Sequence, residues 1–353
     1  PFQARSRPLY CFNFGSVCAQ CDGREQVLKA VTSVATGERG SSPWLGRIRS
    51  VLDLRYLALL SSIATYALIV LGGTVRATDS GLACPDWPRC HGQFIPPLET
   101  NILIEYSHRL AAASVGLLIV GTAVAAWLWY RDNRFVLAGA AAAVALLIVQ
   151  VLVGAVTVNM ELPDTVVALH LSIALMLLAV LIATTVGAVW WQRPAPSAAG
   201  GPGARSEIAG LTVVTAFATL ALILLGSYVA NSGAGLVYPD WPLFNGKLVS
   251  AGGRLADLHY AHRLLAVVVG ALVLALAVRI WRRERRPALV AGVAFALAAY
   301  VAEVLVGAVN VWFEMPTSVR IVHLALASAV WAALVFILVW AYAEARSALP
   351  EAA

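Results

Sequence analysis

Long apolar stretches separated by short polar connections run along the chain from about residue 54 onward. A stretch of about 20 apolar residues is long enough to cross the hydrocarbon core of a bilayer as an α-helix. Eight stretches meet that length, near residues 54–75, 104–130, 135–158, 166–190, 208–229, 258–281, 288–311 and 317–342. The pattern therefore predicts an all-α polytopic membrane protein with eight transmembrane helices.

The composition agrees with this class and argues against a soluble protein. Of the 353 residues, 60% are hydrophobic and only 12% are charged, whereas soluble domains carry about a quarter charged residues. The net charge of +6 does not indicate nucleic-acid binding, because the basic residues lie in the connections between the apolar stretches.

Basic residues gather in alternate connections, and this fixes the expected orientation. By the positive-inside rule, connections rich in Lys and Arg stay on the cytoplasmic side. We therefore expect both termini in the cytoplasm and residues 76–103 on the opposite side of a prokaryotic cell membrane, with the mitochondrial inner membrane as the alternative. The basic connections carry Arg39, Arg47, Arg49, Arg55, Arg131, Arg134, Arg193, Arg205 and "RRERR" at 282–286.

The chain contains an internal repeat of two similar units. Residues 151–174 align without a gap to residues 304–327 with 13 identities in 24 positions, and "GLACPDWPRCHG" at 81–92 aligns to "GLVYPDWPLFNG" at 235–246. Each unit holds an even number of helices, so both enter the membrane in the same direction. We expect tandem four-helix bundles related by a pseudo-twofold axis along the membrane normal.

The repeat also sets the expected domain boundaries. We predict an N-terminal four-helix unit at 51–192, a Pro/Gly-rich linker at 193–206, a C-terminal four-helix unit at 207–345 and a tail at 346–353. Residues 1–50 fall outside the pattern, and we expect a disordered arm or a start assigned too far upstream. Their "CAQC" at 18–21 and Cys11 could bind metal, but no histidine or fourth cysteine lies nearby.

Four of the six histidines occupy equivalent places in the two units. His108 and His262 lie near the start of the second helix of each unit, and His170 and His323 near the start of the fourth. Two imidazoles at one depth on neighbouring helices can ligate a haem iron between them. A single intramembrane histidine is more often an interhelical hydrogen-bonding residue, but the repetition of both pairs favours two haem sites.

Arginines follow the first histidine of each pair. Arg109 and Arg263 could each pair with a haem propionate, because the guanidinium fork matches a carboxylate; extension toward lipid head groups is the alternative. His91, in the first outer loop, we expect to be simply exposed.

Glu105 marks a difference between the units. It lies three residues before His108, on the same helix face, and the second unit has His259 at that position. A carboxyl group so placed could shuttle a proton or stabilise a cation at the edge of a porphyrin. Glu-x-x-His also occurs in di-iron bundles, although the second copy here reads His-x-x-His. An interface residue bonded to arginine or water is the simplest alternative.

Two cysteines flank "PDWPR" in the first outer loop. Cys84 and Cys90 lie six residues apart on the side where disulfides persist, and the second unit has Tyr238 and Phe244 in their places. A structural disulfide and a role tied to the first unit both remain open.

Together, "EYSHR" at 105–109, the paired histidines, the outer Cys-x5-Cys and the four-plus-four repeat resemble the haem A synthase family over residues 51 to about 345. The resemblance implies oxidation of the C8 methyl group of haem O to a formyl group, giving haem A for terminal oxidases. It implies that His108 and His170 hold the substrate haem, that His262 and His323 hold a haem b cofactor, that Glu105 is the essential glutamate, and that Cys84 and Cys90 are redox-active.

The same resemblance implies partners. A haem O synthase would supply the substrate and a terminal oxidase would receive the product; a homo-oligomer in the lipid bilayer is also compatible with it. Some members carry a second cysteine pair where this chain has Tyr238 and Phe244, which puts a relay through two pairs in doubt. The main rival is a quinol-linked di-haem b electron-transfer cytochrome that does no chemistry on the haem. A thiol-oxidising protein and a transporter are weaker rivals.

Overall fold

The computed structural model describes residues 53–190 and 202–346, except residues 251 and 285. In this part of the chain, eight helices are long and apolar enough to cross a membrane, as predicted, and no strand is assigned. The elements are α3 (Leu54–Ala77), α4 (Thr100–Trp129), α5 (Arg134–Asn159), α6 (Asp164–Trp190), α7 (Pro202–Asn231), the short 3-10 helix η1 (Ala234–Leu236), α8 (Arg254–Arg283), α9 (Pro287–Trp312) and α10 (Thr317–Arg346).

The helix starts differ from the apolar runs in three places. Helices α4 and α8 begin at Thr100 and Arg254, four residues before the runs at 104 and 258, because a first turn facing the outer loop does not need apolar residues. Helix α7 begins at Pro202, inside the expected linker; proline suits a first helical turn, where its missing N–H is not needed. Residues 1–50, with Cys11 and "CAQC", and most of the expected linker and tail lie outside the described residues.

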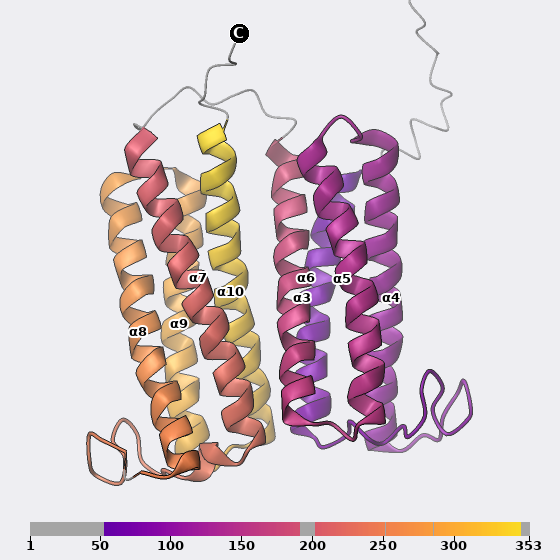
Figure 1. Cartoon of the computed structure of the whole chain (residues 1–353), viewed down its shortest axis with the longest axis vertical. Helices are drawn as coiled ribbons and strands as arrows, with labels where there is room; N and C mark the ends of the chain where they lie inside the picture. Colours follow the sequence, from indigo (N-terminus) through magenta and orange to yellow (C-terminus); the bar gives the residue numbers. More distant parts are fainter. Residues whose placement is uncertain (1–52, 191–201, 251, 285, 347–353) are drawn as a thin grey trace, which may run out of the picture. The chain divides into compact units, whose positions relative to one another are not determined.

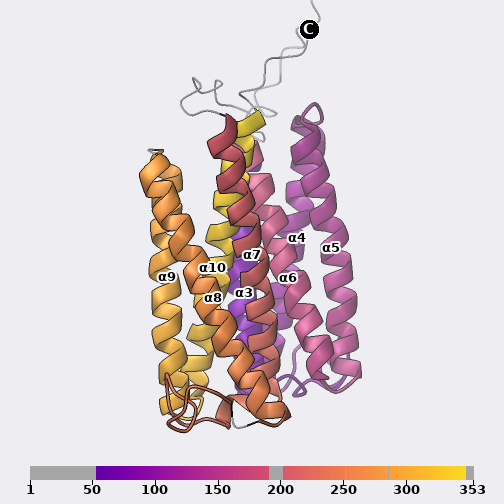
Figure 2. The same ribbon diagram turned by 60° about the vertical axis from the view of Figure 1, so that its left-hand side comes forward.

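Helices α3 to α6 pack against one another, and α7 to α10 do the same (Figures 1 and 2). Between these groups, α10 packs against α3 and α6, and α6 packs against α7. Since α7 and α10 are the repeat equivalents of α3 and α6, the contacts α3–α10 and α7–α6 correspond to each other. The pseudo-twofold axis along the membrane normal, which would relate the two groups of helices, stays a prediction.

Small residues and hydrogen bonds hold the two groups of helices together. A Cβ atom added at Gly73 in α3 would lie 2.4 Å from Leu324 Cδ2 in α10, so the backbones approach closely there. The Tyr66 hydroxyl donates to the Ala325 carbonyl at 2.9 Å, and the Trp331 indole N–H donates to the Leu175 carbonyl at 3.0 Å. Such contacts are what hold helices together in lipid, where burial of apolar surface gives no net drive.

The two long loops, α3–α4 and α7–α8, lie at the same end of the molecule (Figure 1). They share backbone geometry as well as sequence. Each has a cis Trp–Pro peptide, and His91 and Asn245 both adopt a φ of +54° just before a glycine. The carboxylates of Asp86 and Asp240 accept hydrogen bonds from the backbone N–H groups of these turns. The duplication therefore extends to the loops.

Candidate haem-binding site

A cavity of about 1080 Å³, lined mainly by apolar side chains, reaches both pairs of predicted histidines. This volume slightly exceeds that of ordinary small-molecule pockets, about 300–1,000 Å³, so a large ligand would fit. The polar residues on its wall include every predicted site residue except the cysteines; they are Glu105, His108, Arg109, His170, His262, Arg263 and His323, and His259 lies among them.

Each of the four histidine rings lies against a glycine. A Cβ atom added at Gly72 would lie 3.1 Å from Cε1 of His108, and one added at Gly226 would lie 2.8 Å from Cε1 of His262. The fourth-helix histidines repeat the arrangement, with 3.1 Å from Gly154 to His170 and from Gly307 to His323. The absence of a side chain at these glycines is therefore what makes room for the four rings.

The protein itself leaves one ring nitrogen of each histidine without a hydrogen bond. Nδ1 of all four histidines is buried without a hydrogen-bond partner among the described residues. A buried polar atom without a partner costs free energy, about 1–3 kcal/mol for a neutral group, and usually has a functional reason. Paired imidazoles on an apolar cavity wall are a donor set that can hold a haem iron.

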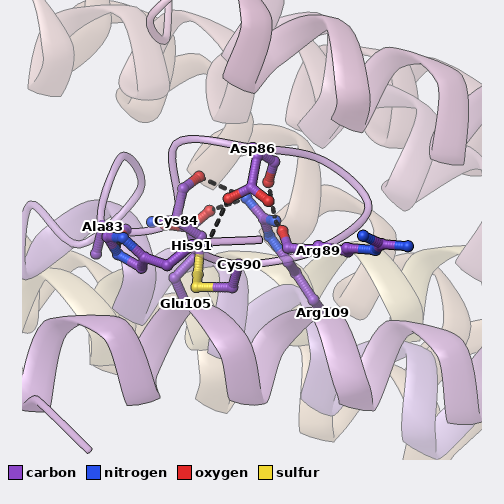
Figure 3. A network of polar contacts seen from close by, with 8 residues as sticks. All are labelled: Ala83, Cys84, Asp86, Arg89, Cys90, His91, Glu105 and Arg109. Carbon is purple, nitrogen blue, oxygen red and sulfur yellow. Dashed lines mark hydrogen bonds and ion pairs between the residues drawn. A yellow bond between two sulfur atoms is a disulfide. The ribbon is translucent and has the colours of Figure 1, made fainter. Parts of the chain in front are cut away.

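Glu105 is buried at the edge of this cavity, with 3% of its surface exposed. Its Oε2 accepts a hydrogen bond from the Cys84 backbone N–H at 2.8 Å, and its Oε1 accepts one from Arg109 Nη2 at 2.5 Å. Figure 3 shows the first outer loop folded directly over this carboxyl group. Glu105 is therefore fixed in place by the loop and by the next turn of its own helix.

The loop over Glu105 is closed by a disulfide between Cys84 and Cys90 (Figure 3). Both cysteines are almost fully buried, and Ile102 and Tyr106 of α4 pack against them. Because the Cys84 N–H is also the donor to Glu105, the disulfide and the carboxyl group belong to one connected structure.

Arg109 and Arg263 hold the outer loops in both halves. Arg109 donates to the backbone carbonyls of Asp86, Arg89 and Cys84, and Arg263 donates to those of Asp240 and Leu243. These contacts favour a role in anchoring the loop. Pairing with a haem propionate stays a prediction, and Arg263 Nη2 is buried without a hydrogen-bond partner among the described residues.

The second half closes its loop differently. Tyr238 and Phe244, which replace the cysteines, pack edge to face with ring centroids 5.1 Å apart. His259, in place of Glu105, accepts a hydrogen bond from Arg263 Nε at 3.0 Å. An aromatic pair thus takes the place of the disulfide, and an imidazole takes the place of the carboxyl group.

Sequence reasoning missed two polar residues beside the fourth-helix histidines. Gln150 in α5 places its amide nitrogen 3.2 Å from Nε2 of His170, and Glu303 in α9 places Oε1 3.1 Å from Nδ1 of His323. They are equivalent positions of the repeat. The available signal was a polar side chain within a long apolar run, which in a membrane helix usually marks a functional site.

The carboxylate of Asp86 makes the first outer loop sensitive to acid. Hydrogen bonds from the backbone N–H groups of Gly92 and His91 lower the pKa of Asp86 below its usual value. Because the folded-state pKa is lowered, the ionised Asp86 stabilises the folded loop at pH values above the ordinary aspartate pKa of about 3.9. This stabilisation is lost as the pH falls through the lower pKa of the folded state.

We expect Asp86→Ala to speed reduction of the Cys84–Cys90 disulfide at neutral pH by about fivefold, the factor that one ordinary hydrogen bond represents. The ratio of variant to wild-type rates should approach one below the folded pKa. Alkylation of the freed thiols and mass spectrometry give both rates, and Asp240→Ala in the second-half loop is the matched control. A ratio of one at neutral pH would contradict the expectation.

Comparison with known proteins identifies the family of this chain. The family model COX15-CtaA, described as a cytochrome oxidase assembly protein, matches residues 55–103 and 99–335. The chain is 32% identical over 297 residues to the Heme A synthase of Symbiobacterium thermophilum, covering 80% of this chain and 94% of that protein. It is 27% identical over 305 residues to the Heme A synthase of Geobacillus thermodenitrificans, covering 83% of this chain and 93% of the relative.

The family match spans both histidine pairs and the loop that closes over Glu105. The family match covers well over half of the chain, and the Symbiobacterium relative matches most of both sequences. The chain therefore belongs to the haem A synthase family of cytochrome oxidase assembly proteins.

Proposed function

We propose that this protein oxidises the C8 methyl group of haem O to a formyl group and so produces haem A for terminal oxidases. Relatives that carry the name Heme A synthase support this activity. The observation that carries it is an asymmetry: two equivalent histidine pairs line one cavity, but only the first half has a buried carboxyl group held under a disulfide loop.

The two halves would hold different haems. His108 and His170, close to Glu105, would bind haem O as the substrate, and His262 and His323 would bind a haem b cofactor. When bound, haem b would supply one-electron redox chemistry in the second half. The glycines opposite each ring, which leave room for the imidazoles on the cavity wall, support both placements.

Glu105 is the group we assign to the reaction. Its carboxyl group lines the cavity and is shielded from water by the loop, so its charge acts in a medium of low dielectric constant. It would stabilise positive charge or accept a proton as the methyl carbon is oxidised. Arg109 and the Cys84 N–H would keep it in place, and reversible opening of the Cys84–Cys90 bond would couple that placement to thiol chemistry outside.

The placement in the cell follows from the charge pattern. We propose an integral protein of a prokaryotic cell membrane with both termini in the cytoplasm and the two long loops on the outer side. A haem O synthase would supply the substrate and a terminal oxidase would receive the product.

A di-haem b electron-transfer cytochrome is the second candidate. The glycines and histidines have nearly equal geometry in both halves. This symmetry favours the cytochrome, because it gives no reason for one haem to leave. Such a protein would hold haem b permanently in both sites.

The masses of the haems extracted from the purified protein, expressed beside a supply of haem O, distinguish these functions. We expect haem b together with haem A or hydroxylated haem O. Haem b alone, in an amount of about two per chain, would instead establish the electron-transfer cytochrome. The absence of any haem would rule out both functions.

A further inference from the structure

Glu303 is the one acidic side chain in helix α9, which has no basic residue. Its side chain has 13% of its surface exposed and lines the cavity. Oε1 lies 3.1 Å from Nδ1 of His323, within hydrogen-bonding distance, although the two groups are not aligned for a hydrogen bond, and Oε2 has no partner among the described residues. An acid at this depth is costly unless it is used.

The first half offers a direct comparison. The rings of His170 and His323 are seated alike: in each, Cε1, Nδ1 and Nε2 lie 3.1, 3.8 and 3.9 Å from the Cβ position of the facing glycine. The equivalent residue, Gln150, is a neutral amide whose nitrogen approaches Nε2 of His170 at 3.2 Å. The halves therefore differ here in charge and in which ring nitrogen the neighbour approaches.

This difference matters for a ligating imidazole. A carboxylate beside Nδ1 favours the tautomer with the proton on Nδ1, so the Nε2 lone pair is left for a metal. The negative charge of a carboxylate beside the ring also makes the imidazole a more basic ligand, which stabilises the oxidised iron relative to the reduced iron. The Gln150 amide is neutral, and its N–H donates to Nε2 of His170, so it takes up that lone pair and adds no negative charge beside the ring.

We propose that Glu303 is a positioning residue that holds His323 for iron ligation through Nε2 and lowers the reduction potential of the haem in the second half. This inference rests on the proposed function, since it requires haem b at His262 and His323. The exchange of Gln150 for Glu303 at one position of the repeat would thus give the two haems unequal reduction potentials.

The test is a potentiometric titration of the full-length protein in a His108→Ala background, in which the second-half haem is the one expected to remain. We expect Glu303→Gln to raise the reduction potential of this haem. At a fixed potential, the ratio of reduced to oxidised haem should rise at least about tenfold, which is equivalent to about 59 mV for one electron. Glu314→Gln, which removes an exposed acid at the outer end of the same half, is the matched control.

Each outcome bears on the proposal. A ratio in Glu303→Gln that stays within about twofold of the parent, less than a weak hydrogen bond represents, would overturn it. So would equal shifts in Glu303→Asp and Glu303→Gln, because aspartate keeps the charge. If Glu303→Gln does not accumulate, Glu303→Asp is the deciding variant. Its reduction potential is expected to stay near that of the parent. A tenfold shift in its ratio of reduced to oxidised haem would refute the role. If the parent itself holds no haem, the proposed function fails first.

Discussion

Glu105→Ala is expected to leave haem O bound and unreacted. The ratio of haem A to haem O in extracts of the purified protein should fall by about 100-fold or more, the range that a positioned carboxyl group contributes to proton transfer. The reason is its position: Glu105 is 3% exposed and lines the cavity that holds His108 and His170. Mass spectrometry of the extracted haems measures the ratio.

Two further variants separate chemistry from loop anchoring. Glu105→Gln keeps an oxygen that can accept from the Cys84 N–H, so the disulfide should be reduced at the wild-type rate while conversion is still lost. Glu99→Ala removes an exposed acid that makes no capping hydrogen bond at the start of the same helix, and conversion should be unchanged. Normal conversion by Glu105→Gln would show that the carboxylate has no part in the reaction.

Removal of one ligand from each pair is expected to empty one half at a time. His262→Ala should lower the haem content from about two to about one per chain and remove haem b, because a haem iron held by two imidazoles loses an axial ligand. His108→Ala should instead retain haem b and lose the substrate haem. Pyridine haemochrome spectra and extracted masses give the amount and the identity.

His91→Ala is the control for this pair of variants. His91 is exposed, lies in the first outer loop and is not among the residues that line the cavity, so its loss should leave both haems in place. The assignment of haem b to the second half would be wrong if His262→Ala retained haem b and lost haem O.

The helices and the histidine pairs could be predicted because their signals are local or repeated. An apolar run of bilayer length predicts a span, and the gapless match of residues 151–174 to 304–327 pairs His170 with His323 without any structure. The starts of α4 and α8 were less predictable, since Thr100 and Arg254 continue the helices into polar sequence.

The connections around the site could not be predicted from side-chain patterns. Arg109 and Arg263 bind backbone carbonyls of the outer loops, and the direction of a carbonyl depends on loop conformation that no residue type specifies. The contact of Glu303 with His323 joins residues 20 positions apart on neighbouring helices, so helix rotation decides it. The packing of Tyr238 on Phe244 was likewise hidden, because the alignment shows only that cysteines are absent.

The two loop closures have different chemistry. A thiol can break the Cys84–Cys90 bond, but it has no effect on the packed rings of Tyr238 and Phe244. A reductant that reaches this end of the molecule would therefore open the loop of the first half and leave the loop of the second half closed. Because the Cys84 N–H donates to Glu105, opening that loop would act on the pocket that contains Glu105.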